Sequence, residues 1–269
     1  MKKVIRIILL VILCLAILFP LVYSFQLSLF SRKDFLSQSA RFFPSEITFA
    51  NYTKAFGYRY LPIELVNSLV TATLSATIKT CVLVLAAFAF SHMRFKGKKF
   101  FLVLLLATLF VPQDALLYQN YKIVAKLGLL DTYLGIIAPT LFSASQMALL
   151  LGALTSYDKD YYDNARIDGA SDMLYIVKIL TPLTKSFLIT IFLQSFIGVF
   201  NSYMWPLLVT NKPKTRTIQV GLTMLGFAEE GNIGAQMATI FMTILPFAII
   251  LAFSKKLIEK ALINSSMHS

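Results

Sequence analysis

The stretch VIRIILLVILCLAILFPLVYSFQLSLF, residues Val4 to Phe30, decides the class of fold. It is almost wholly apolar and longer than the roughly 20 residues that a helix needs to cross the hydrocarbon layer of a membrane. Lys2, Lys3 and Arg6 at its start also fit a secretory signal peptide, but the run is too long for one, and no small-x-small cleavage motif follows. We therefore expect residues 1–30 to form a first, uncleaved transmembrane helix.

Five further apolar runs follow along the chain. Hydrophobic residues make up 57% of the 269 residues and charged residues 14%, whereas soluble domains carry about 25% charged residues. Because a backbone in lipid must satisfy its own hydrogen bonds, each run is expected to be a helix. The expected fold is all-α: a polytopic membrane protein with six transmembrane helices. The five further spans are predicted at residues 65–92, 100–117 (through Pro112), 133–154, 186–209 and 235–253.

Charges between the spans predict the orientation. With the N-terminus inside, slightly more cations lie on the cytoplasmic side, and Arg94, Lys96, Lys98 and Lys99 crowd one short turn there. Positive charge in short loops marks the cytoplasmic face. We expect a multi-pass protein of a bacterial-type plasma (inner) membrane, in contact with membrane lipid and with both termini cytoplasmic. Basic loops then explain the net charge of +12, and no nucleic-acid partner is expected.

Hydrophilic segments between the spans complete the predicted organisation. Residues 31–64 are expected to be extracytoplasmic, residues 65–257 to form a five-helix transmembrane core, and residues 258–269 to be a cytoplasmic tail. Within the core, residues 158–182 form a long cytoplasmic segment. The two cysteines, Cys14 and Cys81, both fall inside spans and are expected to be reduced packing residues.

The segment 158–182 predicts two short helices joined by a glycine turn. The first is expected over about Asp160–Asp168, with acids in its first turn where the helix dipole favours them. Gly169 is placed to end it, and Ser171 to cap a second helix before Pro182. The second helix is expected to present one apolar face, made of Met173, Leu174, Ile176, Val177 and Leu180.

This segment also carries a family resemblance. The run Ala165-Arg166-Ile167-Asp168-Gly169-Ala170-Ser171, with Pro182 downstream, resembles the cytoplasmic EAA loop of permease subunits of binding-protein-dependent ABC importers. It looks most like the sugar branch, the maltose and glycerol-3-phosphate permeases. The chain has Asp163-Asn164-Ala165 where the family usually has Glu-Ala-Ala, and Tyr157-Asp158 where a proline is common.

Further segments resemble the family in the same order, over about residues 50–260. They lie before, at the start of, between or within the predicted spans, in the order found in the family. These segments are Asn51-Tyr52 with Phe56, Asn67-Ser68, Arg94-Phe95-Lys96-Gly97, Leu127-Gly128-Leu129-Leu130-Asp131-Thr132, and Asn201 with Trp205-Pro206-Leu207-Leu208.

The resemblance implies that the loop is a coupling helix that docks on a separate ATPase subunit. Small residues would let another backbone approach, Ile167 would be an apolar anchor, and Arg166 and Asp168 would form charged contacts at the rim. The alternative is that Gly169 is only a helix C-cap. The implied coupling residues are Asp163, Ala165, Arg166, Ile167, Asp168, Gly169, Ala170 and Ser171.

The family also implies partners and a solute. The expected partners are a second homologous permease subunit, forming a heterodimer, two ATP-binding subunits and an extracytoplasmic solute-binding protein. The expected solute is a sugar, oligosaccharide, polyol or glycerol phosphate. Polar residues in spans are candidates for the solute path, although Tyr203 and Trp205 also fit an interfacial aromatic belt. The path candidates are Gln113, Asn201, Tyr203 and Trp205.

Lys79 is a cation in the middle of the second span, among Ser75, Thr77 and Thr80. It is expected to face the solute path or a partner helix, or to pair with an acid elsewhere. The sequence favours none of these roles over the others.

Motifs for catalysis are missing from the sequence. No Gly-x-x-x-x-Gly-Lys-Ser/Thr loop is present, so ATP–Mg is expected on the partner ATPase subunits and no cofactor on this chain. Neither a metal-ligand spacing around His92 and His268 nor a catalytic triad is seen, so no metal and no enzymatic activity are expected. A secondary transporter that needs no ATPase is the main alternative, and a membrane-embedded enzyme or assembly factor is a third.

Overall fold

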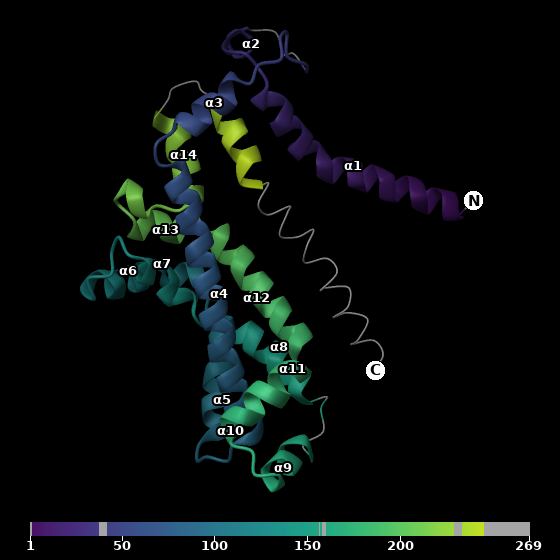
Figure 1. Ribbon diagram of the computed structural model, residues 1–269, viewed down its shortest axis with the longest axis vertical. Coiled ribbons are helices and arrows are strands. Elements are labelled where there is room, and N and C mark those ends of the chain that lie inside the picture. Colours follow the sequence, from purple (N-terminus) through teal and green to yellow (C-terminus); the bar gives the residue numbers. More distant parts are fainter. Residues whose placement is uncertain (1, 38–41, 156, 158–159, 229–232, 245–269) are drawn as a thin grey trace. The chain divides into compact units, whose positions relative to one another are not determined.

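The computed structural model describes residues 2–37, 42–155, 157, 160–228 and 233–244 (Figure 1). The described residues contain helices and turns and no strand, which confirms the all-α prediction. The chain divides into two compact units, one of residues 1–65 with 218–252 and the other of residues 66–217 with 253–269. The boundaries fall near the start of α4 (Leu61–His92) and at α14 (Ile218–Ala228).

The first unit is organised around α1 (Lys2–Ser28) and α3 (Ala50–Gly57). Asn51 on α3 donates two hydrogen bonds through Nδ2, to the carbonyls of Ser28, the last residue of α1, and of Phe30. The same side chain lies against Gly234, where any Cβ would collide with it. Asn51 therefore joins three segments. The unit also contains α2 (Arg32–Leu36), α14 and a helix over Ile233–Ile244.

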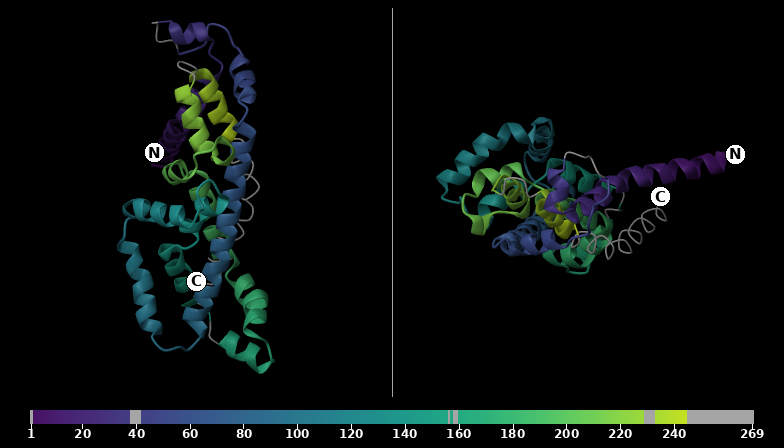
Figure 2. Two further views of the ribbon diagram at one scale, coloured as in Figure 1. Left: turned by 90° about the vertical axis from the view of Figure 1, so that its left-hand side faces the viewer. Right: turned by 90° about the horizontal axis from the view of Figure 1, so that it is seen from above.

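The second unit is built on α4, which continues to His92, and on α8 (Ala144–Thr155) and α12 (Lys185–Phe200) (Figures 1 and 2). Apolar side chains of these helices meet in one core that includes Leu83, Met147, Leu150 and Ile191. The helices after α4 are α5 (Lys98–Ala107), α6 (Leu117–Lys126), α7 (Tyr133–Ile137), α8 (Ala144–Thr155), α9 (Asp160–Ile167), α10 (Asp172–Tyr175), α11 (Thr181–Leu183), α12 (Lys185–Phe200) and α13 (Met204–Val209). Short 3₁₀ turns are η1 (Thr108–Phe110), η2 (Gln113–Leu116), η3 (Ala138–Thr140) and η5 (Pro213–Thr215), and η4 (Ile176–Leu180) is a π-helix.

Two of the predicted spans are single long helices. Val4–Ser28 and Leu61–His92 are long and apolar enough to cross a membrane, and the count among the described residues rises to five if each of three bent helix pairs is one span. The predicted sixth span, 235–253, is helical over Ile233–Ile244, and residues 245–253 lie outside the described residues. The predicted tail 258–269 lies outside them as well.

The third predicted span, 100–117, bends at Pro112, whose ring interrupts a helix, but the expectation that the fourth and fifth spans are single unbroken helices is wrong. Helix direction changes by 96° near Pro112 and by 52° between η3 and α8. The fifth helix ends at Phe200, and α13 starts afresh at Met204. Proline accounts for the last break, because Pro206 lacks an N–H and fits only the first turn of a helix. In α13 it occupies that first turn.

A cluster of hydrogen bonds around Asp131, here called the Asp131 knot, joins two loops of the second unit. Asp131 Oδ1 accepts from the backbone N–H groups of Asn211 and Lys212 and from the Thr215 hydroxyl. Asp131 itself has a left-handed backbone, with φ of 58°. Burial disfavours the charge, but these donors outweigh it and lower the pKa of Asp131.

Candidate functional site

The predicted helix–turn–helix is present as α9, a glycine turn and α10. In α9, Asp160 and Asp163 lie in the first turn and Arg166 in the last, where each sign of charge complements the helix dipole. We call the stretch Asp160–Leu183 the projection. It lies near the His92 end of α4, beside the turn into α5 (Figures 1 and 2).

The turn at Gly169 is a Schellman motif. Gly169 has φ of 81° and donates its N–H to Arg166 O, while Ala170 donates to Ala165 O. These two bonds close the end of α9 in the way that a glycine at this position permits. A Cβ on Gly169 would meet no other atom, so the chain needs glycine here for its backbone conformation and not for space.

Ser171 begins the second helix as predicted. Its side chain accepts a hydrogen bond from the N–H of Leu174, which is a helix N-cap. Beside it, Arg166 and Asp172 form an ion pair at 3.3 Å between partly exposed side chains. Such a pair adds about 0–1 kcal/mol in water, so it orients α9 against α10 more than it stabilises them.

Aromatic packing attaches the projection to the end of α4. Tyr162 of α9 and Tyr175 of α10 contact each other edge to face with ring centroids 5.0 Å apart. His92 of α4 lies 5.0 Å from the first ring and 5.3 Å from the second. Its Nε2 is hydrogen-bonded to the Tyr175 hydroxyl at 3.3 Å, and Phe88 stacks on it. Sequence reasoning missed this cluster.

The hydroxyl of Tyr162 is also held in place. It donates a hydrogen bond of 2.9 Å to Asp172. Burial first, and then that bond to a carboxylate, raise the pKa of Tyr162. The hydroxyl therefore remains a donor throughout the physiological range. Asp172 receives both this bond and the Arg166 pair, so one carboxylate fixes the relative position of the two short helices.

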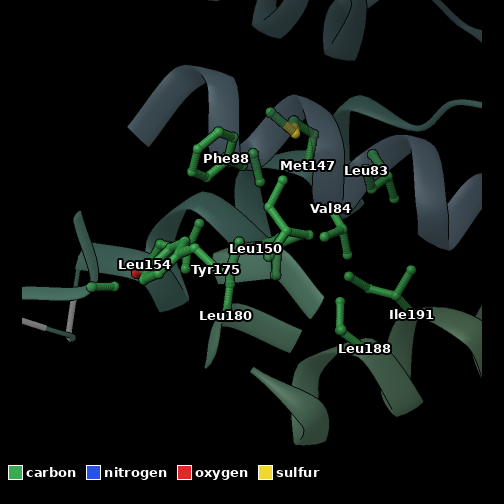
Figure 3. Packing of buried hydrophobic residues seen from close by; sticks show 13 residues of the cluster. Leu83, Val84, Phe88, Met147, Leu150, Leu154, Tyr175, Leu180, Leu188 and Ile191 are labelled. Carbon is green, nitrogen blue, oxygen red and sulfur yellow. The ribbon is translucent and has the colours of Figure 1, made fainter. Parts of the chain in front are cut away.

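Beneath the aromatic cluster the projection joins the apolar core of the second unit. Tyr175 and Leu180 lie among Phe88, Leu150 and Leu154 (Figure 3). Tyr175 is 2% exposed and contributes a large ring to this packing. A displacement of the projection would therefore be transmitted to α4 and α8 through close-packed side chains.

The predicted single apolar face of the second helix is wrong. Ile176 and Leu180 are buried in the core, whereas Met173, Leu174 and Val177 are exposed. The apolar positions lie on two faces, because the helix has one face against its own unit and another away from it. Ala165, predicted to leave room for a partner, is instead buried against this chain's own core.

The exposed end of the projection is apolar at its centre. The Ile167 side chain is 82% exposed, although it follows the charged Arg166 and precedes Asp168. Ala165 faces inward on the same helix. The remaining predicted coupling residues, Asp163, Ala170 and Ser171, lie in α9 and the adjoining turn. The structure thus brings all the predicted coupling residues into one compact element.

The predicted path residues do not form one group. Trp205 is 8% exposed and donates its indole N–H to the carbonyls of Gly135 and Ile136, so its ring packs inside its own unit. Asn201 is exposed at the C-cap of α12, and Tyr203 is half-buried. Gln113 lies in η2, and its side chain is outside the described residues. Their role in solute binding stays a prediction.

Comparison with known proteins identifies the family. The model of the family described as "Binding-protein-dependent transport system inner membrane component" matches residues 3–264. The chain belongs to this family. It is therefore the membrane-embedded permease component of an ABC importer, a transport protein and not an enzyme, and it works with an ATPase and a solute-binding protein.

Individual relatives agree with the family. The chain is 29% identical over 98% of its length to "sn-glycerol-3-phosphate transport system permease protein UgpE" of Agrobacterium fabrum, covering 96% of that protein. It is 28% identical to the protein of the same name in Rhizobium meliloti, over 93% of this chain and 92% of that one. The fold resembles a solved bacterial ABC transporter involved in the import of the acidic polysaccharide alginate, with a TM-score of 0.84, 24% identity and 95% of each chain covered.

Proposed function

We propose that this permease carries a sugar or sugar-like solute, such as an oligosaccharide, a polyol or glycerol phosphate, and that the projection couples it to ATP hydrolysis. The solute class is supported by similarity to proteins named for sn-glycerol-3-phosphate transport. In this proposal ATP and Mg²⁺ bind two partner ATPase subunits, and a second, different permease subunit completes the path. Both termini and the projection are cytoplasmic.

The observation that carries the proposal is the exposure of Ile167 at the end of a firmly attached element. An isoleucine that is 82% exposed, beside charged neighbours, has the character of an interface anchor surrounded by a polar rim. Tyr162, Tyr175 and His92 hold the element on α4. A partner that moves the Ile167 end would therefore rotate the helices behind it as a rigid body.

The test is purification of the tagged chain from native membranes in mild detergent. The wild-type chain is expected to retain a partner that hydrolyses ATP. Ile167→Asp places a charge in the contact and should weaken it by about 2 kcal/mol, roughly 30-fold in affinity. The side chain touches little of its own unit, so the amount of the variant in the membrane should not change.

Leu127→Asp is the matched control. Leu127 is 65% exposed and lies in the loop beside the Asp131 knot, far along the sequence from the projection. This variant should retain the ATPase at the wild-type level. Equal retention by Ile167→Asp and Leu127→Asp would reject the projection as the docking element, and failure of the wild-type chain to retain any ATPase would reject the coupling proposal.

A further inference from the structure

Beyond its exposed first residue, Lys185, α12 exposes one polar face. From Ser186 to Asn201, the exposed positions are Thr190, Gln194, Gly198 and Asn201, and the others are buried or half-buried. Intervals of four, four and three residues place them on one side of a helix. Each of the four is polar or glycine, in a helix that is otherwise mainly apolar. We call this set the α12 polar face.

The α12 polar face differs from a surface suited to lipid. On α1, the exposed side chains are large and apolar, as Leu9, Ile12 and Leu15 show. An exposed amide such as that of Gln194 would lose its hydrogen bonds to water in hydrocarbon, which makes such residues rare on lipid-facing surfaces. The α12 polar face is therefore suited to contact with water inside the transporter.

Hydrogen bonds connect this face with the interior of the unit. Gln146 on α8 donates through Nε2 to Gln194 Oε1 at 3.1 Å, and its own Oε1 accepts from the Ser195 hydroxyl at 3.2 Å. Gln146 is 6% exposed. The exposed amide of α12 is thus the outer member of a polar layer that continues between α12 and α8.

Lys79 lies at the level of this layer. Leu83 on α4, Met147 on α8 and Ile191 on α12 share one core (Figure 3). Lys79 lies one turn before Leu83, and Ser195 lies one turn after Ile191. Because α4 and α12 are antiparallel (Figure 1), both steps lead in the same direction from that core. Gln146 adjoins Met147. The layer next to that core therefore contains Lys79 together with Gln146 and Ser195. Ser75 lies one turn before Lys79 on α4, and its hydroxyl is hydrogen-bonded to that of Thr140 at 2.6 Å.

The charge of Lys79 has no counter-ion in the part of the chain that the structure describes. Its side chain is 8% exposed, and no hydrogen bond or ion pair to its ammonium is found among the described residues. It is the one charged residue between Val66 and Ser91 in the sequence. A buried cation of this kind raises the electrostatic potential over the neighbouring surface.

We propose that the α12 polar face lines the solute path and that Lys79 behind it makes the path favour anionic, hydroxyl-bearing solutes. The amides and hydroxyls of the layer can exchange hydrogen bonds with solute hydroxyls, and the ammonium attracts a phosphate or carboxylate group. Rings of lysine or arginine select anions in other membrane pores by the same electrostatics. This inference rests on the proposed importer function and gives its solute a charge.

The test measures access of small charged reagents to the α12 polar face in the assembled transporter. Gln194→Cys is made in a background carrying Cys14→Ser and Cys81→Ser. Native membrane vesicles are treated with sulfonate-bearing (anionic) or trimethylammonium-bearing (cationic) methanethiosulfonate. We expect both to react, with the anionic reagent favoured. In Lys79→Met the ratio of the two rates should fall about tenfold, and in Lys79→Arg it should be retained. Both reagents react with the same thiolate, so any effect of Lys79 on thiol ionisation changes both rates equally and leaves their ratio unchanged.

Leu85→Cys is the control position, because Leu85 is an exposed apolar residue of α4 expected to face lipid and to react with neither reagent. No reaction at Gln194→Cys, or equal reaction at Leu85→Cys, would overturn the path assignment. A rate ratio that Lys79→Met leaves unchanged would overturn the selectivity. Retention of the ATPase by the same preparations is measured in parallel, so that failure of the importer proposal is recognised separately.

Discussion

The projection and the Asp131 knot are two connections between segments of one unit, and they are built in opposite ways. The projection is held by apolar and aromatic contacts, with Tyr175 buried against Phe88 and His92. The knot is held by one carboxylate that accepts three hydrogen bonds from residues 211–215. Close-packed rings resist displacement and transmit force. Hydrogen bonds at an exposed loop set the direction of one segment relative to another, and less free energy is lost when they are broken.

The two connections also expose different chemistry. The projection presents apolar Ile167, and the loop that forms the knot, residues 211–216, carries Lys212, Lys214 and Arg216. A rigid element with an apolar end suits a partner that moves with it. We therefore expect the projection to tolerate few changes to its packing and the knot to tolerate loss of its charge. Substitutions at three positions test that comparison.

The largest effect is expected from Tyr175→Ala. Removing a buried aromatic ring costs about 3–5 kcal/mol, and here the ring joins the projection to α4. Uptake should fall to background even where the ATPase is still retained, because docking and transmission would be separated. Solute uptake and ATPase retention are measured on the same cells.

Tyr175→Phe is the control for that change. It keeps the ring and removes only the 3.3 Å hydrogen bond to His92, a loss of about 1 kcal/mol. Uptake near the wild-type level is expected. If the Phe and Ala variants were equally inactive, the hydrogen bond and not the packing would carry the coupling, and the contrast with the knot would disappear.

A smaller effect is expected at Gly169. Its φ of 81° costs an ordinary L-residue about 1–2 kcal/mol, and Asn tolerates this conformation better than Ala. Since a Cβ meets nothing within the chain, Gly169→Asn should keep more uptake than Gly169→Ala if only the backbone matters. Equal, complete loss in both would show instead that a partner surface closes over this glycine. Uptake rates at matched membrane levels decide between the two.

These differences also explain what the sequence predicted and what it did not. The projection is specified by adjacent residues: acids at the start of α9, Gly169 at its end and Ser171 as the next cap. Its attachment depends on Tyr175 and His92, which are 83 residues apart. Nothing in the local sequence pairs them.

Separation along the sequence also explains why neither the Asp131 knot nor the packing of Trp205 was predicted. Asp131 meets Lys212 across 81 positions, and Trp205 meets Gly135 across 70. From the sequence, Trp205 fits either the solute path or an interfacial belt. An indole N–H can donate to any nearby carbonyl, and the sequence does not show which carbonyl lies near it. The α12 polar face has a readable spacing, but a helix this apolar gives no sign of which face its own chain covers.

The smallest effect is expected from Asp131→Asn, which keeps a side chain that tolerates the left-handed φ of 58°. The amide can still accept from Asn211 or Lys212, so the midpoint of thermal unfolding should fall by only a few degrees, about 2–4 °C.

Because the pKa of Asp131 is lowered in the folded protein, its carboxylate stabilises the fold above the unfolded pKa. That stability is lost as the pH falls through the folded value. The difference between wild type and Asp131→Asn should therefore be full at neutral pH and vanish in strong acid. If Asp131→Asn lowered the midpoint of thermal unfolding as much as Tyr175→Ala does, the knot, and not the aromatic packing, would be the stronger of the two connections.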